Sequence, residues 1–87
     1  MAETAEESIK LEDQSEAQAL FGAGDKNISL IRHFFKIDIY QRGGLLKIRG
    51  AKQEVDAVYQ IVKHLLAKIQ KTGSLPQRDV DEILASR

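Results

Sequence analysis

With 87 residues, 43% of them hydrophobic and 30% charged, the chain has room for one small hydrophobic core. It has no cysteine, which excludes disulfides and thiol metal sites, and no apolar run approaches the roughly 20 residues of a membrane span. The net charge is zero, but residues 1–25 carry −6, residues 26–75 carry +7 and residues 76–87 carry −1. These features predict a one-domain cytoplasmic protein with an acidic start and a basic middle, and its acidic start is unlike a targeting segment.

The first residues predict a disordered acidic tail followed by a strand. Residues 1–7 hold three glutamates and little apolar surface, so we expect them to be disordered. Residues 8–12 alternate polar and apolar side chains, which favours a first β-strand. Alternatively these five residues extend the tail, which would leave a two-stranded hairpin packed on helices.

Two short helices joined by a glycine-rich turn come next. Residues 15–21 favour a helix that Ser15 caps and that Gly22 ends in the left-handed conformation. A second helix begins at Asp25, whose carboxylate suits the N-cap and the positive end of the helix dipole. Its apolar residues recur at helical spacing and are expected in the core: Ile28, Ile31, Phe34 and Phe35.

A β-hairpin and a long helix make up the middle of the chain. Residues 36–40 and 46–49 alternate, and Gly43 and Gly44 between them suit the positive φ angles of a short hairpin turn. We expect one face of this hairpin to be apolar, with Ile37, Ile39, Leu46 and Ile48. Residues 52–71 predict a helix with one apolar stripe: Val55, Val58, Val62, Leu65 and Ile69, widened by Tyr59 and Leu66.

A short final helix completes the predicted order of elements. Gly73 ends the long helix, and Pro76 suits the first turn of a helix that carries Val80, Ile83 and Leu84. The order is then β-α-α-β-β-α plus a C-terminal helix, an α+β fold. Because type I KH domains have this order, we expect a small KH-like domain over residues 8–72 and a C-terminal helix over residues 73–87.

The turn at residues 22–25 resembles the G-x-x-G loop of KH domains, with Asp25 in place of the last glycine. In KH domains this loop lets the sugar-phosphate backbone approach the main chain closely, with contacts to about four nucleotides. Here Ala23 and Gly24 supply no cation, and Asp25 would repel a phosphate. From the residues alone the segment is either a helix–helix turn with an N-cap or a loop that contacts RNA.

Basic residues gather on the second helix, the hairpin and the start of the long helix, where a KH-like layout brings several beside the loop. They are Lys26, Arg32, Lys36, Arg42, Lys47, Arg49 and Lys52. A solvated face that binds nothing is the alternative. If the chain binds single-stranded RNA, we expect its contacts at Gly22, Ala23, Gly24, Lys26 and Asn27, with salt-sensitive affinity from Arg32, Arg42, Lys47 and Arg49.

No catalytic constellation is visible in the sequence. His33 and His64 are solitary and lack metal-ligand spacing, so we expect neither a metal site nor a cofactor in this chain. It contains no G-x-S-x-G elbow and no G-x-x-x-x-G-K-[ST] loop. We therefore expect no enzymatic activity from the chain by itself.

Residues 20–31 match a sequence motif that is typical of one protein family. The pattern L-[FY]-G-x-x-D-x-N-[IL]-x-x-[IL] is matched by Leu20, Phe21, Gly22, Asp25, Asn27, Ile28 and Ile31. The later elements, an R-G-[NG] turn, a strand that ends in glycine and a proline-containing helix, are matched by Arg42, Gly43, Gly44, Gly50 and Pro76. In these positions the chain resembles the N-terminal domain of PhoH-like proteins, and Asp25 fits that family's own pattern.

The resemblance implies a KH-like accessory domain that precedes a cytoplasmic P-loop ATPase domain beginning beyond Arg87. That absent domain would bind ATP and Mg²⁺ and act in RNA metabolism, while the present chain positions single-stranded RNA and has no catalysis of its own. The alternative is a protein-docking or homo-oligomerisation module without nucleic-acid binding. Low aromatic content favours it, since Tyr40 and Tyr59 offer few rings on which bases could stack. Membrane binding is not expected, because the apolar stripe of the long helix is needed for the core.

Overall fold

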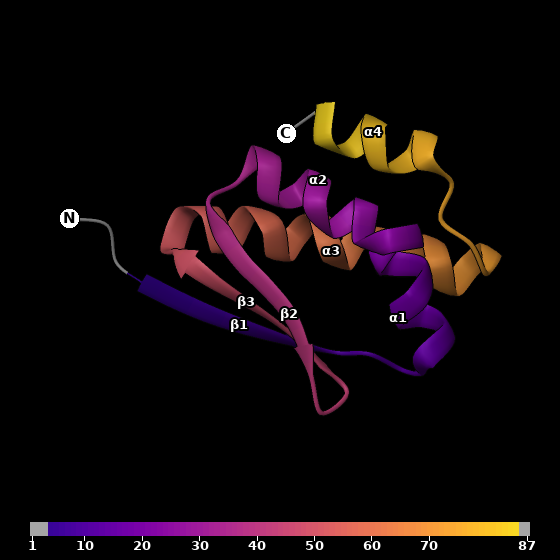
Figure 1. The fold of residues 1–87 in the computed structure, drawn as a ribbon, viewed down its shortest axis with the longest axis horizontal. Coiled ribbons are helices and arrows are strands. Elements are labelled where there is room, and N and C mark those ends of the chain that lie inside the picture. Colours follow the sequence, from indigo (N-terminus) through magenta and orange to yellow (C-terminus); the bar gives the residue numbers. More distant parts are fainter. Residues whose placement is uncertain (1–3, 86–87) are drawn as a thin grey trace.

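Helices pack on a three-stranded antiparallel sheet in the computed structural model, which describes residues 4–85 (Figure 1). The α+β class is confirmed. In chain order the elements are β1 (Thr4–Lys10), α1 (Gln14–Phe21), a 3₁₀ turn (Ala23–Asp25), α2 (Lys26–Phe34), β2 (Ile37–Arg42), β3 (Leu45–Ala51), α3 (Lys52–Thr72) and α4 (Gln77–Ala85).

Strand β3 is the middle strand of the sheet, between β1 and β2. Gly43 and Gly44 both have positive φ (+59° and +80°), as a tight hairpin turn between β2 and β3 requires. The side chains expected on the apolar face of the hairpin are all buried, and Ile9 of β1 joins them. The predicted hairpin and its inward face are therefore confirmed.

The long helix α3 closes the core over β1 and β3. The five residues of its predicted stripe are buried along the whole helix, as are Leu66 and Ile61, whereas Tyr59 is half-buried. Figure 1 shows α4 beside α2, and Val80 and Leu84 of α4 are buried where this helix packs on α2 and α3. The core is thus one continuous cluster to which all three strands and all the α-helices of the described chain contribute.

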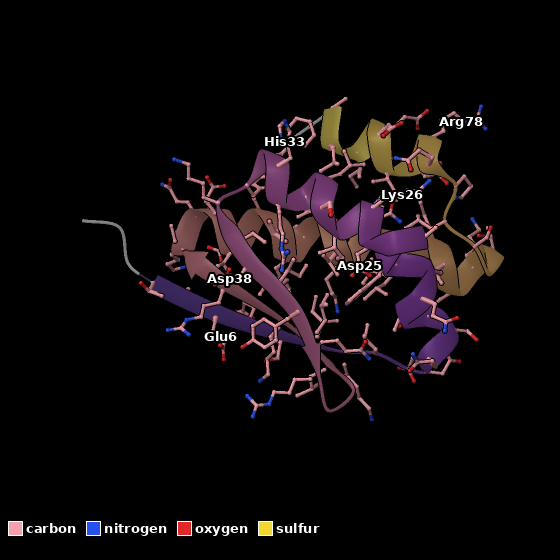
Figure 2. All side chains as sticks on the ribbon, in the orientation of Figure 1. Glu6, Asp25, Lys26, His33, Asp38 and Arg78 are labelled. Carbon is pink, nitrogen blue, oxygen red and sulfur yellow. The ribbon has the colours of Figure 1, made fainter. Side chains whose placement is uncertain are left out.

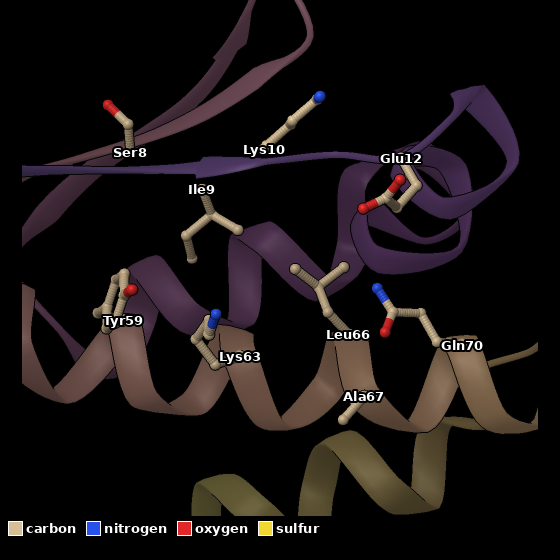
Figure 3. A pocket seen from close by; sticks show the side chains of 9 residues that line it. All are labelled: Ser8, Ile9, Lys10, Glu12, Tyr59, Lys63, Leu66, Ala67 and Gln70. Carbon is tan, nitrogen blue, oxygen red and sulfur yellow. The ribbon is translucent and has the colours of Figure 1, made fainter.

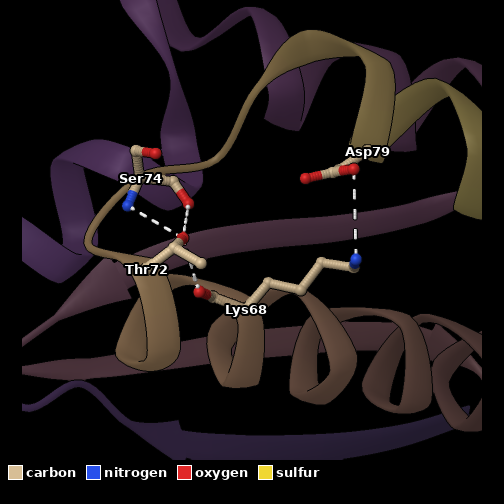
Figure 4. A network of polar contacts seen from close by, with 4 residues as sticks. All are labelled: Lys68, Thr72, Ser74 and Asp79. Carbon is tan, nitrogen blue, oxygen red and sulfur yellow. Dashed lines mark hydrogen bonds and ion pairs between the residues drawn. The ribbon is translucent and has the colours of Figure 1, made fainter.

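Polar contacts fix the turn between α3 and α4 (Figure 4). Gly73 ends α3 in the left-handed conformation (φ +82°), and its N–H donates to the Ile69 carbonyl oxygen at 2.7 Å. The Thr72 hydroxyl lies 2.9 Å from the Lys68 carbonyl oxygen and 3.0 Å from that of Ser74. Lys68 also lies 3.9 Å from Asp79 of α4, a partly exposed ion pair that adds a weak contact across the turn.

The expected disordered start over residues 1–7 is wrong from Thr4 onward, because β1 begins there; residues 1–3 lie outside the described part of the chain. Pairing with β3 extends the strand, since Thr4 lies opposite Ala51 and Glu7 opposite Ile48. The same pairing sets Glu6 opposite Arg49, a residue of opposite charge. The alternative of a two-stranded hairpin is excluded.

Two local predictions about the helices are also wrong. Asp13, not Ser15, is the N-cap of α1, and its carboxylate accepts the Glu16 N–H at 2.8 Å. Phe34, expected in the core, is 41% exposed. Because α2 ends at Phe34 and the chain becomes extended at Phe35, the ring of Phe35 is buried instead.

The packing of α3 on the sheet leads to a prediction about stability. Leu65 is fully buried in the middle of the stripe, and we expect Leu65→Ala to lower the free energy of unfolding by about 2–5 kcal/mol. The half-buried Leu45 offers a matched control, because Leu45→Ala removes the same atoms where water already reaches them. Urea denaturation of both variants measures the difference, and equal losses would contradict this account of the core.

Candidate nucleic-acid interface

The base of the glycine loop is held by a buried asparagine. Asn27, in the first turn of α2, is 2% exposed. Its Nδ2 donates to the Leu20 carbonyl oxygen at 3.1 Å and lies 3.5 Å from that of Ala19. The side chain thereby satisfies carbonyl groups that the C-terminus of α1 leaves without helical partners, and it fastens α2 to α1.

Gly22 and Asn27 form one structural unit. Gly22 has φ +81° and ψ 171°, so its φ is positive as expected, but it lies outside the left-handed helical region. A Cβ atom at Gly22 would lie 2.8 Å from Nδ2 of Asn27, closer than real contacts allow. Both residues were expected to contact RNA, and the structure engages both in closing the helix–helix turn.

The tip of the loop, in contrast, is exposed. Ala23, Gly24 and Asp25 are all accessible to solvent, and Gly24 and Asp25 are both left-handed, with φ +60° and +59°. Asp25 is the single non-glycine residue with positive φ in the described chain. It occupies the N-cap position of α2, as expected, but its carboxylate makes no capping hydrogen bond. Figure 2 shows Asp25 and Lys26 at the junction between α1 and α2.

A groove between the loop and β2 carries no basic side chain. It has a volume of about 210 Å³ and is lined by polar and apolar groups of α1, the loop and β2: Gln14, Ala17, Gln18, Phe21, Gly22, Asp25 and Gln41. Its one charged group is the Asp25 carboxylate. The cations expected beside the loop therefore do not line this groove, although Lys26 follows the loop directly.

Three cations meet at the opposite end of β2, in an open groove of about 460 Å³ that we call the basic groove. Arg32, Lys36 and Arg49 line it, together with Asp38. Arg32 also donates from Nη2 to the Ile39 carbonyl oxygen at 3.2 Å, which ties α2 to β2. Lys36 was counted among the basic residues of the sequence but not among the expected contacts; its place just before a strand was the available signal.

Arg42 and Lys47 lie away from this groove. The register sets Lys47 between Ser8 and Tyr40, and its Nζ donates to Ser8 Oγ at 3.0 Å. Since Leu46 and Ile48 point into the core, the alternation of a strand turns Lys47 to the face of the sheet opposite the helices. Arg42 is the last residue of β2, at the hairpin. The same alternation turns Arg49 to this face as well, so Arg49 shares a face with Lys47 and also lines the basic groove, which Arg42 and Lys47 do not line.

His33 and His64 are both exposed, and within residues 4–85 no three His, Asp or Glu side chains gather as metal ligands would. None of the helices in that same stretch is both long enough and apolar enough to cross a membrane.

Comparison of the chain with protein-family models, with curated proteins and with solved structures gives no match.

The contact between Gly22 and Asn27 predicts non-additive substitutions. We expect Gly22→Ala to destabilise the protein by at least about 2 kcal/mol, because the new methyl group meets the Asn27 amide and φ stays positive. Asn27→Ala should cost about 1–3 kcal/mol, because buried carbonyl groups lose their donor. In the double variant the clash is gone, so the total should fall below the sum by about 1 kcal/mol. Chemical denaturation of all four proteins measures this coupling, and strict additivity would contradict the close contact.

Proposed function

We propose that this chain is a KH-like accessory domain that positions single-stranded RNA for a PhoH-like P-loop ATPase. The observation that carries the proposal is a path for RNA along β2, which we call the RNA track. An exposed glycine loop with left-handed main chain lies at one end of it, and the basic groove lies at the other. The element order β-α-α-β-β-α supports a KH-like interpretation of this arrangement.

In this proposal the loop and the basic groove have different roles. The exposed main chain at Ala23 and Gly24 admits a phosphate closely, because neither residue has a large side chain. Lys36 and Arg49 then attract the RNA phosphates that lie at the other end of β2. Arg32 contributes less, because its guanidinium already donates a hydrogen bond to the Ile39 carbonyl oxygen. Asp25 weakens the loop end, so the domain guides RNA with modest affinity.

Catalysis belongs to the parent protein in this proposal. The resemblance to PhoH-like proteins assigns ATP and Mg²⁺ to a P-loop domain that follows residue 87, in the cytoplasm. The present chain contains no such loop. Its contribution is to bind and orient RNA relative to that domain.

A docking module without nucleic-acid binding is the second candidate. The specific observation in its favour is the groove beside the loop, which has no cation and does have the Asp25 carboxylate. Gly22 and Asn27 are also explained by the fold alone. In this case the exposed loop would contact a protein surface.

Titration with a short unstructured RNA, followed by amide shifts in two-dimensional NMR, separates the two candidates. RNA guidance predicts shifts at residues 23–26 and in the basic groove that weaken as salt is raised. Lys36→Glu with Arg49→Glu should reduce affinity about tenfold or more and lower the salt slope by roughly 1.4.

The matched control for that pair reverses two exposed cations elsewhere, Lys71 on α3 and Arg78 on α4. Lys71→Glu with Arg78→Glu gives the same net charge and should leave most of the affinity intact. If the two pairs lose affinity equally, or if no amide shifts at either salt concentration, the proposed RNA track is wrong.

Neutralising the loop carboxylate provides an independent test. Asp25→Asn keeps a residue type that tolerates the left-handed backbone and removes the charge that opposes a phosphate. We expect RNA affinity at low salt to rise about two- to fivefold. Asp81→Asn on α4 changes the net charge equally and should have no such effect. An equal gain in both variants would show that no phosphate comes near the loop.

A further inference from the structure

Strand β1 leaves one edge of the sheet without a partner strand in the described chain. The Leu11 N–H donates to the Gly44 carbonyl oxygen at 3.0 Å, which shows that the main-chain groups of Leu11 face β3. Because these directions alternate along an antiparallel strand, the main-chain groups of Ile9 and Glu7 also face β3. Those of Glu6, Ser8 and Lys10 point out to the free edge.

The free edge is complementary to itself in one antiparallel register. If two copies of β1 pair about a two-fold axis at Ser8, Glu6 of each copy lies opposite Lys10 of the other. This gives two identical pairs of opposite charge, and the outward main-chain groups of both strands meet directly. Neighbouring registers are poorer, since an axis at Glu7 sets glutamate opposite glutamate, and an axis at Ile9 sets Glu6 opposite Glu12.

The helix side of the same edge is complementary as well. A groove of about 420 Å³ runs between β1 and α3, and its lining includes Ile9, Tyr59 and Lys63 (Figure 3). Lys63 Nζ lies 5.9 Å from the centre of the Tyr59 ring. Glu7 is on the same face of β1 as the buried Ile9, so pairing about Ser8 brings Glu7 of the second copy opposite Ile9, at the mouth of this groove. Its carboxylate then approaches Lys63.

We infer that a second copy of this chain binds along β1 in this register and that the two sheets become one continuous antiparallel sheet. The charge pattern identifies the partner as a second copy. By the two-fold symmetry, Glu6 of each copy pairs with Lys10 of the other, and Glu7 of each copy approaches Lys63 of the other. The edge used is β1, opposite the β2 edge at which RNA was proposed, so this inference does not depend on the proposed function. The contact is small, which makes the dimer weak and dependent on concentration.

Sedimentation equilibrium of the 87-residue chain over a range of concentrations at low salt tests the inference. The wild type should form dimers with a dissociation constant on the order of 10–100 µM, as expected for a small interface. Glu6→Lys and Lys10→Glu each create two like-charge pairs, and each should weaken association about tenfold or more. The double variant restores opposite charges and should restore the dimer.

Two further variants make the result specific. Asp38→Lys is the matched control for Glu6→Lys, because Asp38 also lies opposite Arg49 but on the other edge of the sheet, and it should dimerise like the wild type. Ser8→Pro removes an outward N–H at the centre of the interface and should give a folded monomer by circular dichroism. A monomeric wild type, a dimer indifferent to both single reversals, or a double variant that stays monomeric would each overturn the inference.

Discussion

Burial of β3 between two strands and one helix is the constraint on which the rest of this structure depends. Leu46 and Ile48 are fully buried, and the strands on either side complete the hydrogen bonding of β3. The same strand leads directly into α3, whose apolar stripe covers it. Once β3 is in place, the two edges of the sheet and the direction of α3 are fixed, and the remaining helices fill the surface that α3 leaves.

This arrangement gives the two edges of the sheet different surroundings. The β2 edge is flanked by α2, the glycine loop and the basic groove, with Arg32 bridging part of it. The β1 edge is flanked by α3 and carries two acidic side chains, Glu6 and Glu7, and one basic side chain, Lys10. A nucleic acid at one edge and a second copy at the other would not compete for the same main-chain groups. The zero net charge of the chain conceals this division.

The regular elements could be predicted because their periods are strong and local. The hairpin and α3 follow from alternation and from helical spacing, which need no knowledge of partners. The start of β1 could not be predicted in this way, because Thr4 to Glu7 have few apolar residues and become a strand only through β3, far along the chain. The exposure of Phe34 depends on where α2 ends, and helix ends are poorly marked in sequence.

The candidate site was harder to predict than the fold. Gly22 and Asn27 attract attention as a motif, but the sequence does not say whether the asparagine faces a ligand or the preceding helix; only its burial against Leu20 does. The direction of Lys47 was available from strand alternation, since its neighbours are core residues. The sequence does not predict that Arg32, Lys36 and Arg49 line one groove, because this depends on how α2 crosses the end of the sheet.

The position of β1 in the sheet also bears on the order in which the chain acquires its structure. In the hairpin, Arg42 pairs with Leu45, only three residues away in the sequence. Thr4 of β1, in contrast, pairs with the distant Ala51. Contacts that close long loops form more slowly than local ones, so the hairpin and α3 can assemble before β1 joins them. During synthesis the strand made first is therefore paired last, and until it arrives β3 has an open edge at which another chain can take its place.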